Sequence, residues 1–108
     1  MMNHFLIMGL DQFREELGYP VVINPNGGYS FKGHSEGSFH YQATATDFHV
    51  DPACPFSPRQ QMRELLAIGK FGGVGYYPEW TPVPGFHVDM RLRFQIWVKR
   101  NGEYVYIF

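Results

Sequence analysis

The chain has 108 residues, a length that predicts a single domain spanning residues 1–108. Its aromatic content of 18% is too high for a disordered chain. The formal net charge is −1 and no basic run exists, which disfavours nucleic-acid binding. One cysteine, Cys54, excludes an internal disulfide and a multi-cysteine zinc site, and the oligomeric state stays open.

The N-terminal region carries no targeting signal that we recognise. The longest apolar run, residues 5–8, is far shorter than the ~20 residues that a membrane-spanning helix needs, so no membrane insertion is expected. A basic region and a small-residue cleavage site, the marks of a signal peptide, are also missing. We therefore expect cytoplasmic synthesis without an export signal.

In chain order, the first predicted element is a short amphipathic helix over residues 9–17, with Gly18 as its stop. The β-branched residues of 21–23 predict a short strand. Residues 24–37 are rich in Gly, Asn, Ser and His and are typical of a loop. The Thr-rich alternation of residues 38–50 then predicts a second strand.

The second half begins with a helix, because Ser57-Pro58 pairs a capping residue with a proline at the first helical position. We expect this helix to run to about Ile68. Four further segments complete the prediction: a strand at 74–77, a loop at 78–85, a strand at 86–97, and a hairpin that pairs 96–100 with 103–107 through Asn101-Gly102. The predicted fold class is α+β, with a small antiparallel sheet and two helices.

Two histidines and an aspartate carry the chemistry of the predicted site. Neutral imidazole and carboxylate are good zinc ligands, and three protein ligands leave a fourth position for water. His40 and Asp47 have opposite parity on a straight strand, so they can converge only if the chain bends near Ala43. His87 and Asp89 are two residues apart, so on a strand they share one face.

These residues stand in motifs that resemble those of a known family. Ser38-Phe39-His40 is followed seven residues after the histidine by Asp47, and a Gly-Gly-Val-Gly-Tyr-Tyr-Pro segment at 72–78 precedes His87-Val88-Asp89. The pattern resembles the superfamily of zinc D-Ala-D-Ala carboxypeptidases and murein endopeptidases, which shares its fold with the Hedgehog signalling domain. The resemblance covers roughly residues 17–94.

The resemblance implies that His40, Asp47 and His87 bind one zinc ion and that Ser38 hydrogen-bonds the substrate. Many members also hold substrate with an arginine before the first motif, and here Lys32 is the substitute. Several branches place the general base three residues before the last histidine, where this chain has a proline. The two remaining candidates for the catalytic carboxylate are Asp89 and Glu79.

The expected function is therefore a zinc metallopeptidase that cuts peptide bonds of bacterial peptidoglycan, in the stem peptide or the cross-link. Small size and the missing export signal point to a phage or prophage lysis protein that reaches the cell wall with the help of a separate holin. The alternative is a non-catalytic metal- or peptidoglycan-binding module of a phage particle. Arg91 and Arg93 are assigned to an exposed sheet face, and Tyr77 and Trp80 to either a substrate groove or packing.

Overall fold

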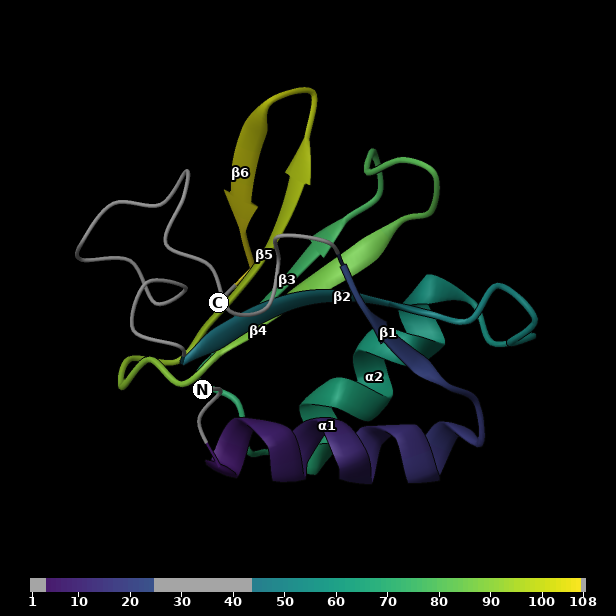
Figure 1. The fold of residues 1–108 in the computed structure, drawn as a ribbon. Helices are drawn as coiled ribbons and strands as arrows, with labels where there is room; N and C mark the ends of the chain where they lie inside the picture. Colours follow the sequence, from purple (N-terminus) through teal and green to yellow (C-terminus); the bar gives the residue numbers. More distant parts are fainter. Residues whose placement is uncertain (1–3, 25–43, 108) are drawn as a thin grey trace.

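The computed structural model describes residues 4–24 and 44–107. In these two stretches the chain has an α+β fold, with both helices on one side of a sheet (Figure 1). The elements are α1 (His4–Leu17), β1 (Val21–Ile23), β2 (Ala45–Val50), α2 (Pro58–Ile68), β3 (Gly73–Tyr77), β4 (Gly85–Asp89), β5 (Gln95–Arg100) and β6 (Glu103–Tyr106). No helix in the described stretches is both long enough and apolar enough to cross a membrane.

The sheet is mixed, which corrects the prediction of a purely antiparallel one. Its strand order is β1-β2-β4-β3-β5-β6, and every neighbouring pair is antiparallel except β3 and β5. After β4 the chain wraps around the start of β3, where Gly72 donates its N–H to Asp89 O and accepts one from Gln95. This crossing places β5 on the free side of β3 and makes those two strands parallel.

The first helix begins at His4, five residues before the predicted start. Its buried side chains Leu6, Leu10 and Phe13 follow helical spacing and pack into the core. Gly9 looked like a boundary in the sequence, but it lies inside the helix, where a Cβ would come within 2.8 Å of the Phe71 ring. Gly9 therefore allows the Phe71 ring to pack directly against the backbone of α1.

The second helix confirms its prediction at both ends. Ser57 caps it by accepting from the Gln60 backbone N–H, and the Gln60 side chain accepts from the Ser57 backbone N–H in return. At the other end Gly69 adopts a left-handed conformation with φ of 68°, and its N–H donates to Leu66 O.

The single strand predicted over residues 86–97 is wrong. β4 ends at Asp89 and β5 begins at Gln95, because the Asp89 carboxylate accepts the backbone N–H of Arg91 and turns the chain. The predicted hairpin between β5 and β6 is confirmed: Asn101 and Gly102 both have positive φ, at 52° and 77°, as a two-residue turn of this kind requires.

The core lies between the helices and one face of the sheet. It is built from apolar side chains of both helices and of the alternate sheet positions that face them: Leu6, Leu10, Phe13, Leu17, Phe48, Val50, Leu65, Phe71, Val74, Phe86 and Val88. Because side chains alternate along a strand, the residues between these positions point to the other face of the sheet. The predicted site residues of β2 and β4 lie on that other face.

Candidate metal centre

Asp47, His87, Gly75 and Trp97 form one row across the middle of the sheet. Asp47 on β2 is paired with His87 on β4, His87 with Gly75 on β3, and Gly75 with Trp97 on β5. Residues opposite one another on neighbouring strands share a face, so this row lies opposite the helices. Gly75 keeps the row compact, since a Cβ there would lie 2.5 Å from Trp97 Cε2.

His87 is held between two carboxylates. Its Nδ1 lies 2.9 Å from Asp47 Oδ1, and its Nε2 lies 2.7 Å from Asp89 Oδ2, both at hydrogen-bond distance. Asp89 is fully buried and His87 is 8% exposed. Charge-assisted hydrogen bonds of this length in a water-poor setting fix the orientation of the imidazole ring.

The same contacts shift the ionisation of both groups. Burial alone would lower the pKa of His87, but its hydrogen bonds to Asp47 and Asp89 outweigh burial and raise that pKa above its usual value. Burial alone would raise the pKa of Asp89, but hydrogen bonds from His87 and Arg91 lower it to about 2. The two carboxylates therefore favour the charged form of the His87 ring, and His87 and Arg91 favour the charged form of Asp89.

The row suits a zinc ion in two respects. Two ligand atoms of one tetrahedral zinc ion, each bound at about 2.0–2.2 Å, lie roughly 3.3 Å apart. Asp47 Oδ1 and His87 Nδ1 are 2.9 Å apart, so a small outward movement would let a zinc ion replace the proton between them. The contact from His87 Nε2 to a buried carboxylate is the arrangement that orients metal-binding histidines in many proteins.

Three of the predicted site residues, Lys32, Ser38 and His40, lie outside the described residues. Within the part of the chain that the structure describes, no group of three or more His, Cys, Asp or Glu side chains is arranged to hold a metal. The described half of the centre thus comprises two candidate ligands, Asp47 and His87, and Asp89 behind them.

The two candidates for the catalytic carboxylate occupy different surroundings. Asp89 is buried, and both of its oxygens accept hydrogen bonds from His87 or Arg91. Glu79 is exposed beyond the end of β3, where its carboxylate accepts the backbone N–H of Asn101 at 2.7 Å. The structure therefore joins Asp89 to the row and connects Glu79 to the turn between β5 and β6.

Two residues that matter for this centre were not assigned to it from the sequence. Arg91 had been placed on an exposed face, but its guanidinium binds Asp89 and lies 4.6 Å from the ring of Trp97. Trp97 in turn lies 5.5 Å from the His87 ring. The spacing of Arg91, two residues after Asp89, is the signal that could have placed it on the same side.

Tyr77 extends the row toward the turn between β5 and β6. Its hydroxyl accepts from Trp97 Nε1 at 3.0 Å, and its ring stacks on Trp80 with centroids 4.3 Å apart. Together with Glu79, Lys99 and Gly102, these two aromatic residues line a pocket of about 230 Å³. Burial raises the pKa of Tyr77 to about 12, so the hydroxyl keeps its proton further into alkali than that of an exposed tyrosine.

The Tyr77→Phe variant is expected to show a weaker pH dependence of stability in alkali. Unfolded Tyr77 loses its proton near pH 10, whereas folded Tyr77 keeps it to about pH 12, so the wild-type protein loses free energy of unfolding across that interval. Urea unfolding at several pH values from 9 to 12 measures the difference, with Tyr19→Phe as the matched control. Equal slopes for wild type and Tyr77→Phe would contradict the assignment.

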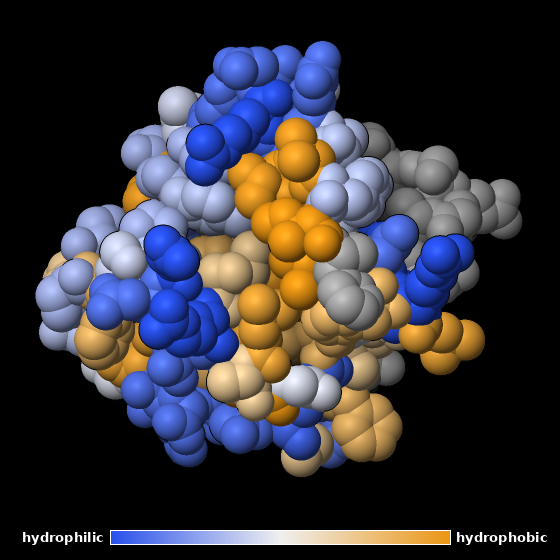
Figure 2. Space-filling view, turned by 180° about the vertical axis from the view of Figure 1, so that it is seen from behind, coloured by the Kyte–Doolittle hydropathy of each residue, from blue (hydrophilic) through white to orange (hydrophobic). Residues whose placement is uncertain are grey.

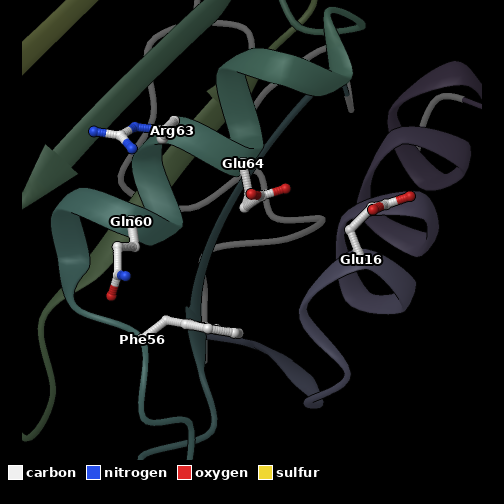
Figure 3. Close-up of a pocket in the computed structure, with 5 residues that line it drawn as sticks. All are labelled: Glu16, Phe56, Gln60, Arg63 and Glu64. Carbon is white, nitrogen blue, oxygen red and sulfur yellow. The ribbon is translucent and has the colours of Figure 1, made fainter.

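Two further hollows in the described structure lie on the helical side. Figure 3 shows a pocket of about 140 Å³ that Glu16 of α1 and Glu64 of α2 flank from opposite sides. A more apolar groove of about 310 Å³ runs between α1 and β1, past Ile7, Val21 and Ile23. Hydrophobic residues also form a band through the face that Figure 2 shows. Neither of these two pockets is lined by Asp47 or His87.

Comparison with known proteins adds no relative: no family model, no curated protein and no solved structure matches the chain. The evidence for the function of the chain is therefore its sequence motifs and the contacts of the row.

Proposed function

We propose that the protein is a zinc-dependent metallopeptidase that hydrolyses peptide bonds in bacterial peptidoglycan. One observation carries the proposal. Asp47 and His87, seven and forty-seven residues after His40, meet on neighbouring strands with Oδ1 and Nδ1 2.9 Å apart, and a buried carboxylate holds the far nitrogen of His87. This is the contact expected of two ligands in a site whose third ligand is His40.

In this proposal the predicted site residues divide into metal ligands and substrate-binding residues. Asp47, His87 and His40 hold the metal, while Ser38 and Lys32 bind the substrate peptide. A zinc ion held by such ligands lowers the pKa of a bound water and polarises the scissile carbonyl. The buried setting of His87 limits the water around the reacting groups, which strengthens their electrostatic interactions.

The general base must exchange a proton with water, and this requirement separates the two candidate carboxylates. Asp89 is fully buried, its oxygens are occupied by His87 and Arg91, and its low pKa makes it a poor proton acceptor. We assign it to positioning His87. Glu79 is exposed and lines the pocket next to Tyr77, so it keeps the role of general base in the proposal.

Digestion of purified peptidoglycan tests the activity. Zinc-loaded protein is expected to release new amine ends, a chelator is expected to abolish the release, and added zinc is expected to restore it. Glu79→Gln should lower the rate by about 10²–10⁴-fold while zinc still binds, because the base is lost and the ligands are not. Glu103→Gln, which changes an exposed glutamate on β6, is the matched control.

A non-catalytic binding module is the second candidate, and one observation favours it. The position three residues before His87 is Pro84, and Asp89 is buried with both oxygens hydrogen-bonded, so neither position supplies a water-exposed general base. For this module, zinc-loaded protein should sediment with peptidoglycan without releasing amine ends. Release that depends on zinc and on Glu79 would exclude it.

A further inference from the structure

Arg91 folds back over Asp89 and occupies both of its oxygens. Its Nε donates to Oδ1 at 2.9 Å and its Nη2 donates to Oδ2 at 2.7 Å, while its backbone N–H donates to Oδ1 at 3.1 Å. A fork of two parallel bonds from a guanidinium fixes a carboxylate in orientation as well as in charge. Asp89 therefore has one arrangement in which its Oδ2 also meets His87 Nε2.

Two further side chains hold the guanidinium of Arg91. Its Nη1 donates to Gln95 Oε1, and its Cζ lies 4.6 Å from the centroid of the Trp97 ring. Gly73 leaves the space that the group needs, since a Cβ at Gly73 would come within 2.6 Å of both Arg91 Nε and Asp89 Oδ2. The side chain of Arg91 is only 21% exposed, which reduces the access of a substrate to the guanidinium.

These contacts form a chain from Gln95 through Arg91 and Asp89 to His87. Asp89, held in place by Arg91, fixes Nε2 of His87, and Nδ1 is the nitrogen that faces Asp47. A histidine whose far nitrogen is fixed in this way presents its other nitrogen to a metal at little cost in entropy.

We propose that Arg91 is a positioning residue of the metal centre: by clamping Asp89 it orients the imidazole of His87 and presents Nδ1, beside Asp47, to the zinc ion. The inference rests on the proposed function, because it assigns a role toward the metal of that site. An arginine with a purely structural role would stabilise the fold without fixing the orientation of the His87 ring.

Two measurements on Arg91→Ala and Arg91→Lys test the inference. The first needs no metal: the His87 Nε2–H resonance in ¹H–¹⁵N spectra is expected to be visible and protected from water exchange in the wild type, and to be lost in Arg91→Ala. The second is the Kd for zinc by competition with a chromophoric chelator, which should rise about 10–100-fold in Arg91→Ala. Arg91→Lys keeps the positive charge but not the two parallel hydrogen bonds, so its Kd for zinc should lie between those of the wild type and Arg91→Ala.

The control is Arg93→Ala, two residues away and exposed, which should match the wild type in both measurements. A folded Arg91→Ala or Arg91→Lys protein with an unchanged Nε2–H resonance and unchanged Kd would overturn the positioning role. A wild type that binds no zinc would overturn the proposed function. In that case the resonance alone decides whether Arg91 orients His87.

Discussion

Replacing Asp89 with alanine is expected to lower the free energy of unfolding by about 3 kcal/mol, the lower end of the cost of breaking a buried ion pair. The variant leaves the guanidinium of Arg91 and the Nε2 of His87 without their shared acceptor. The pKa of His87 falls when its Asp89 partner is removed, and the neutral ring then keeps the cost from being larger. Urea unfolding at neutral pH, followed by tryptophan fluorescence, measures the change.

The matched control for Asp89 is Asp11, whose carboxylate pairs with Arg14 on the exposed side of α1. Asp11→Ala should cost less than about 1 kcal/mol, because both partners of that pair are about half exposed and solvent screens them. If both variants lose the same small amount of stability, the buried network around Asp89 does not contribute as we describe.

Replacing His87 with alanine is expected to weaken zinc binding by about two to three orders of magnitude. Structural zinc sites with four ligands bind with about 10–16 kcal/mol, so losing one ligand removes roughly 3–4 kcal/mol. Asp47→Asn, which keeps the shape of the side chain and removes its charge, should weaken binding in the same direction. Titration of each purified variant with zinc against a chromophoric chelator gives the Kd values.

His4→Ala is the control for the zinc measurement, because His4 lies at the start of α1 and is exposed. It should bind zinc as tightly as the wild type. Zinc binding that is unchanged in both His87→Ala and Asp47→Asn would show that any bound metal lies elsewhere. Circular dichroism of each variant excludes unfolding as the reason for weaker binding.

Much of the fold could be predicted from local signals. The capping residues at Ser57-Pro58, the Asn101-Gly102 turn and the β-branched strand at Val21–Ile23 depend on nearby residues, and the structure confirms all three. The break between β4 and β5 could not be predicted this way. It depends on a buried carboxylate turning the chain, which a pattern of alternating residues does not reveal.

The same distinction applies to the site. Spacing and residue type selected Asp47, His87 and Asp89, and the structure brings these three together. The spacing of Arg91 indicates its side of the sheet, but its contact with Trp97 could not be predicted, because that contact arises from the chain wrapping around the start of β3 and pairing β5 in parallel. Contacts of that kind depend on the topology of the sheet rather than on sequence neighbours.

X-ray absorption at the zinc edge of the loaded protein shows whether Asp47 and His87 share one zinc ion. We expect one zinc per chain with only nitrogen and oxygen neighbours at about 2.0–2.2 Å, the multiple scattering of imidazole, and a weaker imidazole contribution in His87→Ala, where the imidazole of His40 remains. A sulfur neighbour at about 2.3 Å, which would place the metal at Cys54, or a spectrum that His87→Ala leaves unchanged would contradict it.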